Sequence, residues 1–368
     1  MGGAFTLPPP AICADLTTSQ ARLRAHISDH LYGKIPQAPE GLTLTRHPIA
    51  AENAERIEIT LTHKDRMFSV DAALWLPPDA KGPVPLICGL DFVGPAGVMG
   101  TDSFPLDVNA RVYTRPELGA RDARLSPVLR GTSMSRWPLS LIHQAGFGLL
   151  LSCYGSWTPD DPETWKTYGV HPLMQPDTTG AISLWAWALQ QLVDVAQHLP
   201  DIDTRRIAVA GHSRLGKAAL WAAATDTRIG AVFANNSGCG GAAPARHAMG
   251  ETLHQMAQSY PHWIRPNPTT DPTKLPFDQH HLLASIAPGG IYLAEAEDDL
   301  WADPVGSYRA LQAASICWPN IADWPALKDV WLSGQPIQNG ALGYHLRPGG
   351  HDMLPHDWAQ FLRFLKTL

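Results

Sequence analysis

Hydrophobic residues follow two different patterns along the chain. Residues 56–62 alternate between apolar and polar side chains, which predicts an antiparallel strand with one solvated face, and residues 71–76 form its expected partner. Helical stretches are expected at 181–198 and 217–224. Short, continuously apolar runs, typical of parallel strands buried on both faces, lie at residues 84–90, 147–152, 207–210, 231–234 and 291–294. This alternation of strands and helices predicts an α/β fold with a mostly parallel, doubly wound sheet flanked by helices.

The N-terminal part of the chain has a weaker pattern. Residues 17–32 have the spacing of a helix, with Thr17 or Thr18 as the expected N-cap. We therefore expect residues 1–50 to form an extension and a helix packed on the core. Residues 51–368 are expected to form a single domain.

Two long segments interrupt the alternation of strands and helices. Residues 91–135 and 154–180 are rich in Gly, Pro and Asp and have little periodicity. Loops of this length in a compact domain commonly form lids or clefts, so both are expected near a functional site. A final helix at about residues 357–368 is expected to close the sheet. Three tryptophans in or beside the loops suit a cleft wall and core packing equally well: Trp137, Trp157 and Trp165.

Composition and charge exclude several classes of function. The 368 residues are 45% hydrophobic and 17% charged, which excludes a disordered chain. The net charge of −6 argues against nucleic acid and anionic membranes as partners, because both bind clustered Lys and Arg. No apolar run approaches the ~20 residues of a membrane span, and the first ten residues lack the basic and apolar segments of a signal peptide. The five cysteines are scattered without a paired motif, so no zinc site is expected. Nothing in the sequence specifies an oligomeric state.

The strongest motif lies around Ser213. A buried strand leads into Gly211 and Ser213, and a helix follows at once, which is the arrangement of the nucleophile elbow in the α/β-hydrolase fold. The turn lifts the serine hydroxyl above the sheet, and free N–H groups at the start of the helix lie where an oxyanion would form. The motif departs from the usual pattern, because Leu215 stands two residues after the serine and Gly216 follows it. A serine that only caps the helix is the simpler alternative.

A nucleophilic serine needs a base, and the base needs an acid that orients it. In this fold the acid and then the histidine follow the serine along the chain. His351 suits the base, because it lies at the tip of a Pro-Gly-Gly loop after an expected strand at 343–346. His212 and His345 are the alternatives, although the side chain of His212 is expected to point away from the serine hydroxyl.

The acid is expected just after the apolar run at 291–294. Four carboxylates follow Glu295 in this loop, so a solvated loop charge is the simpler interpretation of any one of them. Asp299 has the best offset from the end of the strand, and Asp303 and Asp298 are the alternatives.

With these residues, the chain resembles the glucuronoyl esterases, carbohydrate esterase family fifteen, and most closely their bacterial members. The likeness extends from about residue 29 to the C-terminus. It is carried by the motifs GLDF at 89–92, SRWP at 135–138, GHSRLGK at 211–217, NSGCGG at 236–241, GET at 250–252, YPHW at 260–263, EDDLWAD at 297–303 and GGHD at 349–352. Each motif alone is only moderately informative, but their order along the chain is specific.

The resemblance implies a serine esterase that hydrolyses esters between (4-O-methyl)glucuronic acid on xylan and alcohols of lignin; no cofactor or metal is expected. It implies that Ser213 attacks the uronate carbonyl and that His351 transfers the proton. Arg214 would help hold the oxyanion as a charged donor beside backbone N–H groups. By the same resemblance, sugar hydroxyls would be bound by Lys217, Glu251 and Trp301. Lys217 lies four residues after the serine, hence on the same helix face. The family also implies a secreted or periplasmic location.

One position departs from the family. Many members carry a Glu where this chain has Asn236, and that Glu orients the catalytic histidine. An amide cannot balance a developing imidazolium as a carboxylate does, so this role is expected to fall to Asp299.

Three other functions are compatible with the sequence. An acetylxylan esterase or general carboxylesterase would use the same fold. A carbohydrate-binding relative without activity would keep the fold but lack a reactive serine. A metallohydrolase would use Asp278, His280 and His281, but adjacent histidines on a helix point apart.

Overall fold

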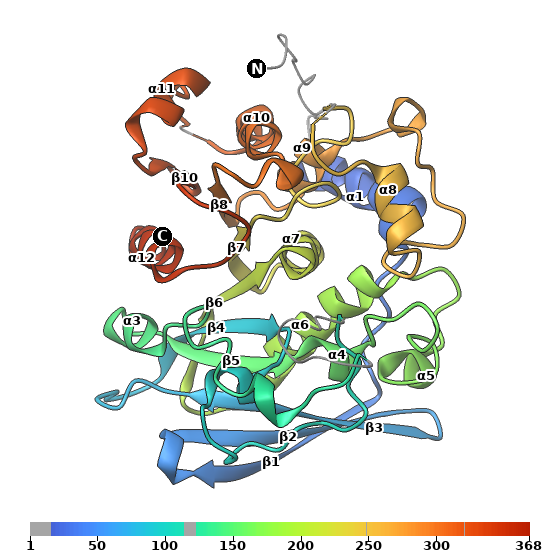
Figure 1. Ribbon diagram of the computed structural model, residues 1–368, viewed down its shortest axis with the longest axis vertical. Coiled ribbons are helices and arrows are strands. Elements are labelled where there is room, and N and C mark those ends of the chain that lie inside the picture. The colour runs from blue at the N-terminus through green and yellow to red at the C-terminus, as the bar shows by residue number, and fades with distance from the viewer. Residues whose placement is uncertain (1–15, 114–122, 248, 320) are drawn as a thin grey trace.

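The computed structural model describes residues 16–113, 123–247, 249–319 and 321–368. Over these residues ten strands form one sheet, in the order β1-β2-β3-β5-β4-β6-β7-β8-β10-β9 (Figure 1). In chain order the strands are β1 Gly41–Ile49, β2 Ala54–His63, β3 Arg66–Trp75, β4 Val84–Asp91, β5 Gly148–Cys153, β6 Ile202–His212, β7 Ile229–Asn235, β8 Gly290–Ala296, β9 Ile337–Asn339 and β10 Leu342–Arg347.

The centre of the sheet is parallel and its edges are antiparallel. Strands β5, β4, β6, β7, β8 and β10 are neighbours with parallel pairing. β1, β2 and β3 extend one edge in antiparallel pairing, and β9 extends the other. In β6, Ile207 and Val209 face one apolar core while Ala208 and Ala210 face the other. The predicted α/β architecture is confirmed, because the continuously apolar runs form the doubly covered centre and the alternating segment forms an edge.

Helices cover both faces of the sheet (Figure 1). The pair α6 and α7 packs on one face together with α9 and α10, and α3 and α12 pack on the other. The expected final helix is present as α12 and begins at a proline, which favours a first helical turn. The helices are α1 Leu16–Ile27, α2 Pro95–Val98, α3 Leu139–Gln144, α4 Tyr154–Trp157, α5 Val170–Met174, α6 Ala181–Gln197, α7 Arg214–Thr225, α8 Leu253–Ser259, α9 Gln279–Ala284, α10 Pro304–Ala314, α11 Leu327–Ser333 and α12 Pro355–Leu365.

Residues 41–49 belong to the sheet, although we expected residues 1–50 to be an extension of the main domain. β1 pairs with β2 along its whole length, from Gly41 opposite Thr62 to Ile49 opposite Ala54. A boundary at residue 50 would therefore separate two paired strands. The sequence pattern does not reveal β1, because all its side chains are exposed or half-buried and no apolar face results.

The N-terminal helix starts earlier than expected. α1 begins at Leu16 and continues through a π-helical turn, Ser28–Tyr32, so Thr17 and Thr18 lie within the helix rather than at its cap.

The three tryptophans considered for a cleft wall are packed in the interior. Trp137, Trp157 and Trp165 are all buried. The indole N–H of Trp137 donates to Asp91 at 3.0 Å and that of Trp157 donates to Ser152 at 2.8 Å. Their apolar rings therefore stabilise the sheet from within.

The parallel strands bring three chain segments to the same edge of the sheet. Ser213 directly follows β6, Asp299 lies three residues beyond β8, and His351 lies four residues beyond β10. In open α/β sheets, ligands bind at the carboxyl ends of the strands, which is the edge where these residues lie.

Candidate active site

Ser213 occupies a strained turn between β6 and α7. Its backbone has φ 58° and ψ −127°, a conformation that costs on the order of 1–3 kcal/mol for a residue with a side chain. Its amide N–H donates to the carbonyl of Asn235 at 2.9 Å. A Cβ added to Gly211 would lie 2.1 Å from the carbonyl oxygen of Leu215, so only glycine fits there. The strand–turn–helix geometry expected of a nucleophile elbow is therefore present.

The structure places Ser213, Asp299 and His351 around one cavity. Nδ1 of His351 lies 2.5 Å from Oδ2 of Asp299. The carboxylate is covered while the imidazole side chain is 35% exposed, so the ring faces the cavity and its partner lies behind it. Burial alone would raise the pKa of Asp299, but the hydrogen bond and charge of His351 and the amide of Asn236 outweigh burial and lower it. Asp299 therefore stays ionised at neutral pH and can stabilise a positive charge on the ring.

The alternatives for the acid, Asp303 and Asp298, and the neighbouring Glu295 have different surroundings. Asp303 accepts a backbone N–H at the start of α10 and lies 2.5 Å from Nδ1 of His247. Glu295 is fully buried, and this burial raises its pKa well above the usual range. Asp298 is exposed. Of these carboxylates, Asp299 is the one that lies against the candidate base.

The alternative histidines also have different partners. His345 is buried, and its Nε2 lies 2.8 Å from Asp357. His212 lines the cavity beside the serine, with Nδ1 2.5 Å from the side-chain oxygen of Asn235. Its ring packs against that of His351, with centroids 4.6 Å apart. His212 therefore forms part of the surroundings of the candidate base, which the sequence pattern did not predict.

Arg214 is buried beside the nucleophile. Its Nη1 lies 2.5 Å from Oδ2 of Asp160, and its guanidinium lies 4.5 Å from the ring centre of Trp263 and 4.6 Å from that of Tyr113. Burial alone would lower the pKa of Arg214, but the negative charge of Asp160 outweighs burial and raises it. Among the described residues, Nε of Arg214 has no hydrogen-bond acceptor. A permanently charged donor with spare hydrogen-bonding capacity thus lines the cavity.

Asp160 supports Arg214 and could not be identified from the sequence. It lies in the long segment 154–180, where its Oδ1 accepts from the indole of Trp263 at 2.7 Å and lies 2.9 Å from Nε2 of His262. Burial opposes ionisation of Asp160, but Arg214 and His262 outweigh it and place its pKa far below the usual range. Two of its partners, Arg214 and His262, are 54 and 102 residues away along the chain, so no local motif predicts these contacts.

Lys217, Glu251 and Trp301 meet at the same cavity. Nζ of Lys217 donates to the carbonyl of Ser237 at 2.7 Å and lies 3.6 Å from Oε2 of Glu251. Trp301 is 54% exposed and stands at the rim. Its carbonyl accepts the N–H of Glu251 at 3.0 Å, which fixes the rim to the deeper part of the site.

The cavity has a volume of about 390 Å³, which suits a small molecule such as one sugar ring. Its walls also include aromatic and apolar residues that the sequence did not mark as functional: Phe92, Val93, Tyr113, Leu129, Tyr260 and Trp263. Over the described ranges, no cluster of three His, Cys, Asp or Glu side chains could hold a metal ion. Asp278 and His281 instead form a cap at the start of α9. None of the described helices is both long and apolar enough to cross a bilayer.

Known proteins share both the sequence and the architecture of this chain. A family model of fungal glucuronyl esterases matches residues 163–322. The carbohydrate esterase MZ0003 of an unknown prokaryotic organism is 32% identical over 98% of this chain and 89% of its own length. The solved glucuronoyl esterase from Solibacter usitatus is 32% identical with a TM-score of 0.84, over 99% of this chain and 98% of that one. The chain belongs to the glucuronoyl esterases.

Two further relatives agree with this assignment. A promiscuous esterase of carbohydrate esterase family 15 from a marine bacterial metagenome has a TM-score of 0.85 at 28% identity, over 99% of this chain and 97% of its own. The 4-O-methyl-glucuronoyl methylesterase 1 of Sodiomyces alcalophilus is 33% identical over 38% of this chain and 31% of its own length. The expected family, its bacterial type and the α/β-hydrolase fold are confirmed.

In this glucuronoyl esterase, the amide at position 236 binds the acid rather than the histidine. Nδ2 of Asn236 donates to Oδ2 of Asp299 at 2.5 Å, the same oxygen that lies against His351. The backbone of Asn236 has φ 46°, a left-handed conformation that Asn adopts more readily than most residues. The amide therefore positions the carboxylate, and of these two side chains only Asp299 has a charge that can stabilise a protonated ring.

The loop that carries His351 is held by Arg347, another residue that the esterase's sequence did not mark. Nε of Arg347 donates to both oxygens of Asp357, at 3.0 and 3.1 Å. Its Nη atoms donate to three loop carbonyls, at 3.0, 3.2 and 2.6 Å: those of Pro348, Gly350 and Asp352. One buried guanidinium thus fixes the backbone on both sides of the histidine.

Proposed function

We propose that this glucuronoyl esterase hydrolyses esters that join the carboxyl group of (4-O-methyl)glucuronic acid on xylan to alcohols of lignin. The observation that carries the proposal is the single cavity around the serine elbow, into which the His351–Asp299 pair faces with its 2.5 Å contact. The methylesterase named above acts, by its name, on 4-O-methyl-glucuronoyl esters, and the cavity has room for such a ring.

The first half of the reaction forms an acyl-enzyme. The hydroxyl oxygen of Ser213 bonds to the ester carbonyl carbon, and its proton passes to His351. The negative charge that develops on the carbonyl oxygen is stabilised by N–H groups at the start of α7 and by the guanidinium of Arg214. The bond from this carbon to the alcohol oxygen then breaks, and His351 returns the proton to the departing alcohol.

The second half releases the acid. A water molecule gives a proton to His351, and its oxygen bonds to the acyl carbon. The bond from this carbon to the oxygen of Ser213 then breaks, and His351 returns the proton to that oxygen. The products are the free uronate and the restored serine. In both halves the ionised Asp299 stabilises the imidazolium, which is why its lowered pKa matters for turnover.

The uronate ring would be held by Lys217, Glu251 and Trp301, which line the same cavity as Ser213. Lys217 can donate and Glu251 can accept hydrogen bonds, and their 3.6 Å separation allows both to bind neighbouring hydroxyl groups of one sugar. The exposed indole of Trp301 offers an apolar face at the rim.

The proposal predicts a clear substrate preference. The purified protein should turn over methyl or benzyl glucuronate with a higher kcat/KM than 4-nitrophenyl acetate. Ser213→Ala should lower turnover of the uronate ester by on the order of 10⁴-fold or more, because the covalent step is lost. A fluorophosphonate should label the unmodified protein but not this variant.

Two outcomes would contradict the proposal. Faster hydrolysis of the acetate ester would indicate an acetylxylan esterase or general carboxylesterase. Absence of fluorophosphonate labelling together with absence of turnover would indicate a carbohydrate-binding protein.

A further inference from the structure

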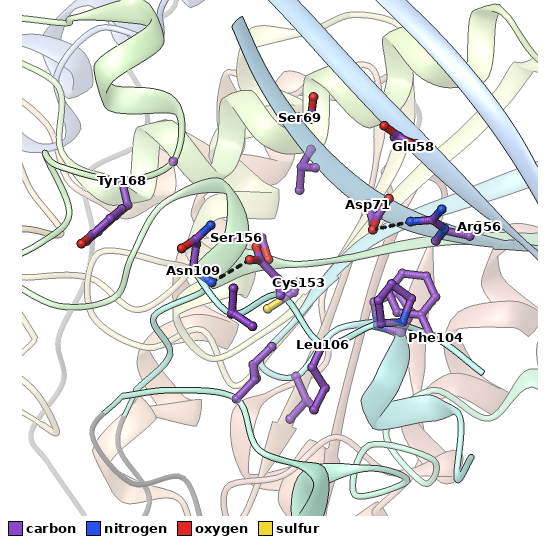
Figure 2. A pocket seen from close by; sticks show the side chains of 18 of the residues that line it. Arg56, Glu58, Ser69, Asp71, Phe104, Leu106, Asn109, Cys153, Ser156 and Tyr168 are labelled. Atoms are coloured by element: carbon purple, nitrogen blue, oxygen red, sulfur yellow. Dashed lines mark hydrogen bonds and ion pairs between the residues drawn. The ribbon is translucent and has the colours of Figure 1, made fainter. Parts of the chain in front are cut away.

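A second cavity lies beside the active site and has no part in the steps above. It has a volume of about 540 Å³ and is formed by β2, β3 and the segment that follows β4. Figure 2 shows Glu58, Ser69 and Asp71 on the two strands, with Phe104 and Leu106 from that segment on the facing wall. The cavity is large enough to hold an aromatic or sugar ring.

This cavity lies on the alcohol side of the nucleophile. In the sheet, the strand that leads to Ser213 has β7 and β8 on one side and β4, β5 and β3 on the other. The proposed sugar-binding residues Glu251 and Trp301 follow β7 and β8. The acyl and alkoxy parts of an ester extend in opposite directions from the carbonyl carbon, so a uronate bound there directs its alcohol toward β4. On that side the active-site wall combines the apolar side chains of Phe92, Val93 and Leu129 with the polar side chains of Thr132, Ser133 and Arg136.

The two cavities adjoin at Val93, which lines both of them. β3 is three strands away from β6 in the sheet, a separation of about 14 Å at the usual strand spacing. A methyl group and a single ring both end before this distance. An alcohol with two linked rings is long enough to enter the second cavity.

One part of the lining suits the face of a ring. The half-buried side chains of Phe68, Leu106 and Leu125 contribute apolar surface, together with the buried ring of Phe104. Each offers surface that a bound ring would remove from water, which is favourable in proportion to the apolar area covered.

The polar part of the lining disfavours anions. Among the described residues that line it are three carboxylates, Glu58, Asp71 and Asp107, and one cation, Arg56. Arg56 pairs with Asp71 at 3.1 Å, which leaves an excess of negative charge. Such a lining repels a second uronate, whereas carboxylate oxygens accept hydrogen bonds from neutral hydroxyl groups.

We propose that the second cavity binds the outer ring of an aromatic alcohol during ester cleavage, so that uronate esters of two-ring alcohols are the preferred substrates. The assignment rests on the proposed function, since it concerns the alcohol part of that substrate. A phenolic ring combines apolar faces with hydroxyl donors, which matches both parts of the lining. A neutral sugar of the polysaccharide is disfavoured, because the polysaccharide is attached to the uronate ring and extends from the opposite side of the serine.

Filling the cavity tests the proposal. Ser69 is exposed on β3. Among the described residues, its hydroxyl forms one hydrogen bond, with the hydroxyl of Thr60 at 2.9 Å. In Ser69→Trp the indole would occupy the cavity. The KM for the glucuronate ester of a two-ring aryl ether alcohol should rise about tenfold, equivalent to about 1.4 kcal/mol, while the methyl ester of the same uronate serves as the internal reference and is turned over as before.

Two further variants separate filling from distortion. Met67 lies on the same strand, is 72% exposed and does not line the cavity, so Met67→Trp should change neither ester. Leu106→Asp alters the facing wall and should weaken the two-ring ester selectively, by loss of apolar contact and addition of negative charge.

Several results would overturn the proposal. Equal KM values for methyl, benzyl and two-ring esters in the unmodified protein would contradict it. An equal rise in KM for the methyl and the two-ring ester in Ser69→Trp would also contradict it. If Ser69→Trp instead weakened only the methyl ester of a glucuronoxylan oligosaccharide, the cavity would be a sugar site. Failure of the proposed function is distinguishable, because the unmodified protein would then hydrolyse 4-nitrophenyl acetate faster than methyl glucuronate, or would hydrolyse neither ester.

Discussion

Among single residues, Asp299 has the most demanding role in the proposed reaction. One of its oxygens contacts both His351 and Asn236, and its pKa is lowered although the carboxylate is largely covered. Relatives with a Glu at position 236 would have a second carboxylate near the histidine, whereas this chain has an amide. The protonated histidine therefore depends on Asp299 for its balancing charge.

This dependence can be measured by comparing two truncations. Asp299→Ala should lower kcat on benzyl glucuronate by on the order of 10⁴-fold, as expected for loss of a triad member. Asn236→Ala removes one hydrogen bond to the same oxygen and should cost about tenfold, the equivalent of about 1.4 kcal/mol. Comparable losses in the two variants, or an Asp299→Ala enzyme that keeps most of its kcat, would reject Asp299 as the acid.

Among the elements, the loop after β10 matters most for the reaction, because its conformation sets the position of His351. Its conformation could not be predicted from the sequence beyond the Pro-Gly-Gly turn, because the bonds that fix it come from Arg347 and run to carbonyls on either side of the histidine. By contrast, the elbow at Ser213 was predictable, since a buried strand, a glycine and a helix are all local signals. β1 and the short β9 were not, because each pairs at an edge and has no buried side chain.

Removing the guanidinium should therefore affect turnover more than binding. Arg347→Met is expected to lower kcat by on the order of 10²-fold with little change in KM, because a shift of about 1 Å in a reacting group has that effect. Rates are to be expressed per active serine, titrated with a fluorophosphonate, so that a misfolded fraction does not count. Arg205→Met serves as the control, since this arginine is 87% exposed and, within the part of the chain that the structure describes, pairs with Asp203 alone. An unchanged kcat per active serine in Arg347→Met would refute the positioning role.

For the molecule as a whole, the sheet joins segments that are remote in sequence, and these remote contacts are what the sequence could not predict. Arg214 and Asp160 form a buried pair across 54 positions, and no spacing rule connects them. The mostly parallel sheet flanked by helices followed from patterning, and the common edge of Ser213, Asp299 and His351 followed from the rules of parallel sheets. The surroundings of the site, supplied by long loops without periodicity, did not.

Stability should depend on pH through a carboxyl group within this sheet. Burial raises the pKa of Glu295 well above its usual range, so the folded protein keeps a proton that the unfolded chain releases above its ordinary pKa of about 4.3. Stability from this group is thus full below that pH and declines as the pH rises. Glu295→Gln, which cannot ionise, should melt near the unmodified protein at pH 4 and higher than it at pH 7–8, by about 1 °C for each kcal/mol gained.

Thermal unfolding of both proteins across this pH range tests the expectation. The exposed neighbour Glu297 offers the matched control, because Glu297→Gln should leave the difference in melting temperature independent of pH. A constant offset between Glu295→Gln and the unmodified protein would show that Glu295 is ionised in the folded state.

The position of Val93 between the two cavities has a consequence for how this enzyme could diverge. The side chain of Val93 belongs to a loop that supplies none of the reacting groups. It nevertheless lines the passage through which a long alcohol would reach the second cavity. A smaller residue at position 93 would join the two cavities into one continuous groove, and a larger residue would close the entrance to the second cavity. Selection for different lignin linkages could therefore act on one aliphatic side chain and leave the machinery of ester cleavage untouched.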